Sequence, residues 1–351
     1  MKRTTAALIA LTAAVALTLS ACSPGGSPSG SPSGSAKPGK LALSVRIISG
    51  GSESFSDAAS HKATELLDAQ GIQVTSSIVA DPATALRAVI SGSADIALLD
   101  PVEAIKAVAN GDAPVKYIAS MSQTTDYVLL AQPKFTLSNL AGATFATAGA
   151  GTAGDVIASA ALAESKVDMT KVQRVTVGGT TARVTAILSG QVDLAPVHAA
   201  DAVPAVATGK VKIMLNAGKV LGSYLQQGLI ASDTFINDKA TTQAVVSAFI
   251  DAERWASSNG TQYIATATSN KLMGSLTAAQ ATAAYQELKN SKVFATNGAV
   301  CEQSVTDTLN HDYKIPGGLT KATTPAYSKW VNASFVNAYL KDKGKDKGGF
   351  C

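Results

Sequence analysis

The chain has 351 residues, of which 46% are hydrophobic and 15% are charged, and its formal net charge is +4 at pH 7. This composition is that of a globular protein, and the near-neutral charge gives no reason to expect a nucleic-acid partner. The histidines stand far apart at positions 61, 198 and 311, without the spacing of metal ligands, so we expect neither a metal nor a cofactor.

Residues 1–21 have the organisation of a secretory signal peptide. Basic residues at positions 2 and 3 precede an apolar segment, 6–19, that is too short and too rich in Ala and Thr for a good membrane span. The segment ends in Leu19-Ser20-Ala21-Cys22, which has the form of a lipobox. We predict that cleavage exposes Cys22 and that a lipid on its thiol anchors the protein at the extracytoplasmic face of the cell membrane. The alternative is an ordinary signal peptide followed by a chance cysteine.

Residues 22–40 form a tether in this interpretation. After Cys22 the segment consists almost entirely of Ser, Gly and Pro, with no large apolar residue. Such a segment cannot bury enough surface to offset the entropy of ordering it, so we predict that it is flexible. The folded part begins near residue 41, and the remaining length suffices for two lobes of ordinary domain size.

A glycine- and serine-rich loop follows the first predicted strand, 41–48, and precedes a helical pattern that runs through Leu67. Glycines between the carboxyl end of a strand and the start of a helix leave backbone N–H groups pointing outward. In open α/β sheets, ligands bind in the crevice at that end of the strands. We therefore predict ligand contacts from Ser49, Gly51, Ser52 and Glu53. The alternative is a plain turn in which a serine caps the helix.

The segment 88–97 recurs 98 residues later, at 186–195. Both copies share Ala, two aliphatic residues, Ser-Gly, two further residues, Asp, an aliphatic residue and Ala. Each copy predicts the end of an amphipathic helix, a glycine that closes it and a short buried strand. Two copies indicate two similar α/β lobes. Asp100 and His198 follow the two strands at the same offset, and either could bind a ligand. Asp100 could instead cap the next helix, and His198 could be satisfied by a neighbouring loop.

The repeated segment resembles the substrate-binding proteins of bacterial ABC importers, in the group that captures nitrate, sulfonates, taurine and thiamine-pyrimidine precursors. The resemblance extends from about Leu41 to about Ile236. It implies an α/β, periplasmic-binding-protein-like fold of type II, in which a ligand cleft lies between two lobes joined by a two-strand hinge. Such proteins close around the ligand by hinge motion.

Two segments with a similar, mainly apolar sequence, 127–131 and 228–232, are interpreted as the strands that cross between the lobes. The first lobe then comprises 41–127 and 228–351, and the second comprises 131–224. Thr124, Thr125 and Tyr224 lie next to these crossings and are predicted to contact the ligand.

The second lobe contains the counterpart of the first loop, at 148–155. It leads into a predicted helix through Ala163, and a further helix is predicted at 180–188. Gly151 and Thr152 are the predicted ligand contacts here. Helix starts from both lobes would suit an anionic or strongly polar ligand. The acidic side chains of the cleft loops have only Arg46 as a nearby basic counterpart, which leaves a neutral or cationic heterocycle equally open.

The C-terminal part, 238–340, is predicted to be mainly helical. Once Cys22 is lipidated, Cys301 and Cys351 remain, and an exported chain with two cysteines favours a disulfide between them. The alternative is two free thiols.

The resemblance implies a non-enzymatic, monomeric protein that captures a small polar solute and delivers it to an ABC permease and its ATPase. One alternative is an enzyme on the same fold, similar to the synthase of the thiamine pyrimidine. Another is the solute receptor of a TRAP-type carrier, which has the same architecture.

Overall fold

The computed structural model describes residues 43–51, 53–315 and 318–351. The predicted signal peptide, the lipidation of Cys22, the tether and Ser52 lie outside these residues. Among the helices that are described, none is both long and apolar enough to cross a membrane.

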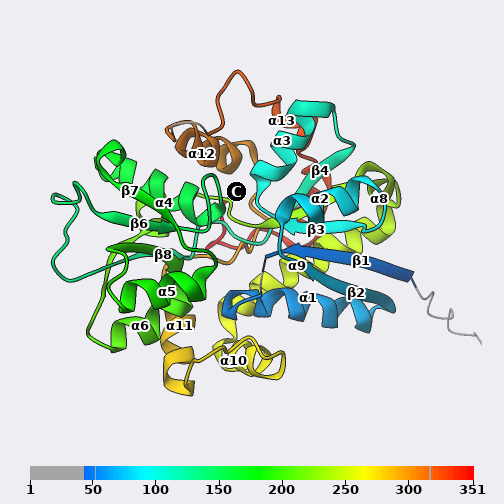
Figure 1. Ribbon diagram of the computed structural model, residues 1–351. Helices are drawn as coiled ribbons and strands as arrows, with labels where there is room; N and C mark the ends of the chain where they lie inside the picture. Colours follow the sequence, from blue (N-terminus) through cyan, green and yellow to red (C-terminus); the bar gives the residue numbers. More distant parts are fainter. Residues whose placement is uncertain (1–42, 52, 316–317) are drawn as a thin grey trace, which may run out of the picture. The chain divides into compact units, whose positions relative to one another are not determined.

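The first sheet has the strand order β2-β1-β3-β10-β4 (Figure 1). Strand β1 is parallel to β2 and β3, whereas β10 is antiparallel to β3 and β4. The strands are β1 (Leu43–Gly50), β2 (Ile72–Val79), β3 (Ile96–Leu99), β4 (Val115–Ser120) and β10 (Gly228–Ser232). Its helices are α1 (Ala58–Ala69), α2 (Pro82–Ile90) and α3 (Pro101–Gly111), with a 3-10 turn at Phe55–Asp57. This sheet and these helices are called the first lobe below.

The second sheet repeats this plan with the order β7-β6-β8-β5-β9. Strand β6 is parallel to β7 and β8, and β5 is antiparallel to β8 and β9. The strands are β5 (Tyr127–Ala131), β6 (Thr144–Thr147), β7 (Gln173–Thr176), β8 (Leu194–His198) and β9 (Lys212–Asn216). Its helices are α4 (Ala153–Glu164), α5 (Thr180–Leu188), α6 (Ala199–Ala207) and α7 (Ala217–Leu221), with a 3-10 turn at Met169–Lys171. These elements are called the second lobe.

The repeated sequence has the same local structure in both lobes. Gly92 and Gly190 end helices α2 and α5 with φ angles of 76° and 77°, a left-handed conformation that glycine adopts without steric cost. The repeated aspartates join neighbouring strands. Asp95 accepts the Arg46 N–H at 2.7 Å, and Asp193 accepts the Thr144 N–H at 3.0 Å. The repeat therefore encodes a helix end and a strand-to-strand connection, and its four-residue strand β3 is buried along its whole length.

The lobes are joined upstream of the two strands that the sequence had suggested. Strands β5 and β10 each lie wholly within one sheet, and the connections are the segments 121–126 and 222–227 that precede them. Backbone bonds link these segments, from Tyr224 N to Gln123 O at 3.1 Å and from Met121 N to Gln227 O at 2.9 Å. A third segment, 293–298, runs alongside through a bond from Gln123 N to Val293 O at 2.8 Å. These three segments are called the junction.

The C-terminal helices contact both lobes, so the assignment of all of 228–351 to the first lobe needs correction. Helix α9 packs along α1, but α11 packs on α6 and α12 touches α4 in the second lobe (Figure 1). His311 of α12 lies 2.8 Å from the Glu164 carboxylate of α4. The helices are α8 (Asp233–Asn237), α9 (Lys239–Ser258), α10 (Gly260–Ser269), α11 (Ala278–Asn290), α12 (Glu302–Asp312), α13 (Tyr327–Trp330) and α14 (Ser334–Lys343).

The last residues of the chain return to the junction. Gln123 donates to the Gly348 carbonyl at 3.2 Å and accepts the Phe350 N–H at 2.8 Å. Cys351 then forms a disulfide with Cys301, with the two Cα atoms 5.9 Å apart. The C-terminal end is therefore held covalently next to the segments that join the lobes.

Candidate ligand-binding site

A cavity of about 440 Å³ lies where the carboxyl ends of parallel strands from both sheets meet the junction. Its volume falls within the range of about 300–1,000 Å³ that is usual for small-molecule sites. The first lobe contributes Gly50, Gly51, Ser54, Ser56, Asp57, Asp81, Pro82, Ala83, Leu98, Leu99, Asp100, Val102 and Glu103. The second contributes Tyr127, Ala150, Gly151, Thr152, Ala153, Val156, Gly179, Thr180, Arg183 and His198, and the junction contributes Gln226 and Gln227.

The two lobes meet beside the cavity at the buried carboxylate of Asp126. Ser56 from the first lobe donates to Asp126 Oδ2 at 2.6 Å, and His198 Nδ1 from the second lobe lies 2.9 Å from Oδ1. Gln226 of the junction donates to Oδ1 at 3.0 Å. Burial would raise the pKa of Asp126, but His198 and these donors outweigh burial and lower it. Burial likewise opposes a charge on His198, yet Asp126 prevails and raises the pKa of His198 well above its usual value. The pair is therefore ionised, imidazolium against carboxylate.

Three helices of the second lobe begin at the cavity without a side-chain cap. Their N-cap residues are Thr152 for α4, Gly179 for α5 and His198 for α6, and none of them caps its helix through the side chain. The Thr152 hydroxyl turns away and donates to the Gly149 carbonyl at 2.8 Å. Helix N-termini carry partial positive charge and outward N–H groups, which favour an anion or another acceptor.

A buried cation, Arg183, lies beside these helix starts. Its residue is 3% exposed, and its guanidinium donates to the carbonyls of Pro196 at 2.8 Å and Gly178 at 2.6 Å and to the Thr180 hydroxyl at 3.1 Å. All three acceptors are neutral. Burial lowers the pKa of Arg183, which Tyr127 and Asp201 partly offset. Because a guanidinium stays protonated in proteins, the positive charge remains at the wall of the cavity.

In the first lobe, α2 and α3 are capped by carboxylates, whereas α1 has no side-chain cap. Asp81 accepts the N–H groups of Ala83 and Thr84 at the start of α2, and Asp100 accepts the Val102 N–H at 2.8 Å at the start of α3. Asp81 lies 3.3 Å from Arg87, and Glu103 lies 3.8 Å from Lys106. Asp100 forms no ion pair within the described residues. Burial, reinforced by the charge of Asp312, raises the pKa of Asp100 well above its usual value.

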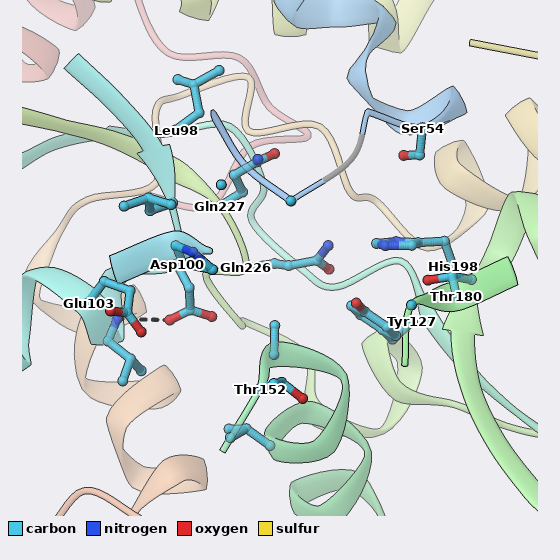
Figure 2. A pocket seen from close by; sticks show the side chains of 18 of the residues that line it. Ser54, Leu98, Asp100, Glu103, Tyr127, Thr152, Thr180, His198, Gln226 and Gln227 are labelled. Carbon is cyan, nitrogen blue, oxygen red and sulfur yellow. Dashed lines mark hydrogen bonds between the residues drawn. The ribbon is translucent and has the colours of Figure 1, made fainter. Parts of the chain in front are cut away.

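Figure 2 shows how these groups lie around the cavity. Asp100 and Glu103 lie on one side, Tyr127, Thr180 and His198 lie on the opposite side, and the Gln226 amide lies between them. The Tyr127 ring stacks near the His198 imidazole, with ring centroids 4.4 Å apart. The cavity therefore has an acidic side, a basic side and an aromatic face.

Five of the predicted site residues line this cavity: Gly51, Asp100, Gly151, Thr152 and His198. Asp100 caps α3, as one of its two alternatives predicted, and it also lines the cavity. Gly51 and Gly151 have φ angles of 106° and 77°, which explains why glycine stands at these two loop positions.

The structure places two other predicted residues on the far side of strand β1. Ser49 and Glu53 line a separate cavity of about 30 Å³, where Glu53 lies 3.2 Å from His61. Strand β1 continues to Gly50, so Ser49 is still inside the strand. Successive strand residues point to opposite faces, which sends Ser49 away from the main cavity when Gly50 faces it.

Thr124, Thr125 and Tyr224 are buried in the junction and do not line the cavity. Their hydroxyls donate to Ser291 O at 2.6 Å, Gln226 Oε1 at 2.5 Å and Asp312 Oδ1 at 2.7 Å, respectively. The Thr125 bond joins two junction segments, and the other two bonds tie the junction to Ser291 and to Asp312 of α12.

Sequence reasoning missed Gln226 and Arg183. Gln226 belongs to a loop without a recognised motif, and Arg183 lies in the first turn of a helix that the pattern predicted correctly. The one signal was the position of Arg183 after Gly178-Gly179, a second glycine-rich helix start. Arg46, the basic residue that the sequence offered, is bonded to Asp95 at 2.6 Å and is absent from the cavity lining.

The structure has a two-lobed α/β fold of the periplasmic-binding-protein type. The ligand-binding component of an ABC-type import system from Staphylococcus aureus, with zinc bound, matches with a TM-score of 0.69 at 13% identity over 84% of this chain and 98% of that one. The sulfonate-binding protein SsuA from Methylobacillus flagellatus KT matches with a TM-score of 0.65 at 19% identity, over 86% and 95%. The nitrate-binding protein NrtA from Synechocystis PCC 6803 matches with a TM-score of 0.67 at 11% identity, over 86% and 89%. The predicted fold class is confirmed.

Residues 65–267 match the family described as NMT1/THI5 like, and this match covers more than half of the chain. The protein therefore belongs to the NMT1/THI5-like family, in agreement with the predicted resemblance. No protein of curated function matches the sequence. Within the described residues, no group of three or more His, Cys, Asp or Glu side chains is placed to hold a metal ion.

Proposed function

We propose that this protein is the extracytoplasmic solute-binding component of an ABC importer, anchored to the cell membrane through a lipid on Cys22. The observation that carries the proposal is the cavity, because both lobes and the junction line it. Membership of the NMT1/THI5-like family and the similarity to import-system binding components support the same function.

Capture by lobe closure is the proposed mechanism. The chain passes between the two lobes through the short segments 121–126 and 222–227. The C-terminal helices contact both lobes. Asp126 already bonds Ser56 of the first lobe and His198 of the second. A ligand that bonds both faces of the cavity would add contacts between the lobes and stabilise a closed form for delivery to the permease.

The alternative of an enzyme is disfavoured by the geometry at Asp126. Ser56, Asp126 and His198 are the residue types of a hydrolase triad, but the Ser56 hydroxyl donates to Asp126 and not to His198. A serine nucleophile requires a bond to its base, with the carboxylate on the far side of the imidazole. The described residues that line the cavity include no cysteine. We therefore propose binding without chemical conversion of the solute.

A thermal-shift screen of the full-length protein tests this function, with sulfonates, nitrate, taurine, pyrimidines, riboflavin and amino acids as probes. A solute at about a hundred times its dissociation constant stabilises the folded state by about 2.7 kcal/mol, a shift of a few degrees. We expect Ala153→Trp, which fills the cavity, to abolish the shift. The matched variant Ala207→Trp, at an exposed helix position outside the lining, should retain it.

Two readouts separate the alternatives. Mass spectrometry of the recovered solute should find it unchanged, whereas conversion would favour the enzyme. Neighbouring genes for an ATPase and a permease would support the ABC importer, and paired membrane subunits of a TRAP system would contradict it. A screen without any hit, together with equal behaviour of both tryptophan variants, would contradict solute binding in this cavity.

A further inference from the structure

We propose that Cys301 and Cys351 form a thiol–disulfide exchange site, and that opening of their bond by a dithiol releases the segment 344–351 from the junction and weakens capture of the solute. The segment 344–351 is called the strap below. The effect on capture rests on the proposed solute-binding function, whereas release of the strap can be measured without any solute.

The disulfide lies at the wall of a second cavity, whose lining shares no residue with the ligand-binding site. This cavity has a volume of about 340 Å³, and Cys301 and Cys351 both line it. Both cysteines are half-buried. The volume is that of a small-molecule site. A small thiol can therefore reach the disulfide from the cavity while the chain stays folded.

The surroundings of Cys301 favour the thiolate that the exchange must release. Cys301 is the N-cap residue of α12, and a helix start carries partial positive charge. Lys341 and Lys345 line the same cavity as the disulfide. The Ser304 hydroxyl oxygen lies 3.6 Å from Cys301 Sγ, where it can donate to a thiolate. A cysteine beside a helix N-terminus and lysines is a good leaving group in thiol–disulfide exchange.

The exchange uses a dithiol as the reductant. One thiolate of the dithiol attacks Cys351 Sγ, the S–S bond breaks, and its electron pair stays on Cys301, which leaves as a thiolate and takes a proton from water. The second thiolate then attacks the dithiol sulfur of the mixed disulfide and releases Cys351, which also takes a proton from water. The dithiol has lost two electrons and two protons and is itself a disulfide, and the protein has gained two thiols.

The strap is bonded to two segments of the junction. In the first segment, Gln123 donates to the Gly348 carbonyl and accepts the Phe350 N–H. In the third segment, Asn297 donates to the Asp346 carbonyl at 2.9 Å and accepts the Asp346 N–H at 2.8 Å. The strap therefore ties the segments 121–126 and 293–298 to each other.

The disulfide fixes the free end of this strap. The residues 344–348 are exposed, so few buried contacts oppose their detachment once the cross-link is open. Detachment removes the bonds of the strap to Gln123 and Asn297, and the junction becomes more mobile. Because closure of the lobes would take place about the junction, a mobile junction must be ordered when the solute binds, and this ordering costs affinity.

Hydrogen exchange in the full-length protein tests release of the strap without a solute. Dithiothreitol is the dithiol, and alkylation with peptide mapping shows that Cys301 and Cys351 have been opened and distinguishes them from Cys22. We expect faster exchange in the strap and in the segments 121–126 and 293–298, with exchange in β1 and β6 unchanged. A disulfide that resists dithiothreitol in the folded protein would overturn the proposal, and so would unchanged exchange of the strap after reduction.

Calorimetric titration with the best solute of the thermal-shift panel tests the effect on capture. Reduction of the parent protein should weaken binding about fivefold or more. Gly349→Ala keeps the cross-link but displaces the strap, because a Cβ at Gly349 would lie 2.5 Å from Asn297 Nδ2. This variant should show the loss before reduction, and reduction should add little to it. Gly111→Ala is the matched control, since Gly111 is exposed and a Cβ there meets nothing within 4 Å. It should bind like the parent in both redox states.

The outcomes separate the strap from the general stability of the fold. Equal or tighter binding by the reduced parent would overturn the effect on capture. Weaker binding on reduction, together with parent-like binding by Gly349→Ala, would also overturn it, because the loss would then come from the opened cross-link and not from the displaced strap. Gly349→Ala decides the question even where the reduced protein unfolds. Absence of binding by every solute in both redox states would contradict the proposed function, and hydrogen exchange would still decide whether the strap is released.

Discussion

The two lobes have the same framework but opposite chemistry at the cleft. Both sheets have the same strand order, and both copies of the repeat place a left-handed glycine and a bonded aspartate at equivalent positions. At the ends of the repeat strands they differ, with Asp100 in the first lobe and His198 in the second. In the first lobe the starts of α2 and α3 are capped by carboxylates, whereas in the second lobe the starts of α4 and α5 have no side-chain cap and lie beside Arg183. Two similar lobes thus present different side chains to the cavity, because a few residues at the strand ends and helix starts differ.

The largest expected effect concerns the framework and not the charge pattern. Replacing both Cys301 and Cys351 with serine opens a cross-link across 50 residues. The chain-entropy treatment assigns such a loop about 4 kcal/mol of unfolding free energy. Denaturant unfolding should detect this loss, and the solute preference of the variant should match that of the parent. A changed solute preference would contradict the view that this preference depends only on the residues that line the cavity.

Arg183→Met tests the second-lobe side. It removes the buried cation, so binding of any solute with an anionic group should weaken about 100-fold, or about 2.7 kcal/mol. Arg183→Lys is the matched control, since it keeps the charge and should retain most of the affinity. Calorimetric titration of both variants provides the measurement. Equal loss in the two variants would mean that Arg183 acts through packing and not through charge.

The Asp126–His198 pair should make the unfolding free energy depend on pH. This free energy should have a plateau and should fall at both lower and higher pH. The pKa of His198 is raised, so its contribution is complete below about pH 6.5, the unfolded value, and is lost as pH rises through the folded pKa. The pKa of Asp126 is lowered, so its contribution is complete above about pH 4 and is lost as pH falls through the folded pKa. Unfolding free energy should therefore be greatest between about pH 4 and 6.5 for this pair.

Asp126→Asn should flatten the dependence at both ends, because each pKa unit of displacement contributes about 1.4 kcal/mol. Unfolding curves recorded from acid to alkaline pH for the parent and the variant provide the comparison. An unaltered profile in the variant would show that the two side chains are not coupled.

The smallest effects on stability and binding are expected from alanine variants at a helix start in each lobe. Thr152→Ala should leave stability within about 0.5 kcal/mol, because the hydroxyl does not cap α4. Asp100→Ala removes a cap and should cost about 1 kcal/mol. Thr152→Ala should still weaken ligand binding several-fold, since the residue lines the cavity. Thermal unfolding measures the stability of both variants, and calorimetry measures ligand affinity. Equal destabilisation by the two alanine variants would contradict the predicted difference between the helix starts of the two lobes.

Local signals predicted most of the elements of the fold. The helix expected at 180–188 is α5 (Thr180–Leu188), and the strand expected after Asp95 is β3. These predictions depend on periodicity, glycine and capping residues, which act over a few residues of chain. The position of the connections between the lobes was missed because a run of hydrophobic residues looks the same in a strand inside a sheet and in a strand that crosses between lobes.

The sequence predicted cavity-lining residues where they precede helices and missed them elsewhere. Gly51, Asp100, Gly151 and Thr152 precede helices, where backbone N–H groups must face a cavity or solvent. Gln226 has no such signal, because the loop that contains it meets the cavity only through tertiary packing. The direction of Ser49 depended on whether strand β1 ended one residue earlier or later.

The central claim is that the cavity lined by both lobes binds a small solute. The most direct measurement is the dissociation constant of the best solute from the thermal-shift screen, determined for the parent, Ala153→Trp and Ala207→Trp. The account predicts that Ala153→Trp abolishes binding and that Ala207→Trp binds like the parent. Equal binding by all three proteins would contradict it.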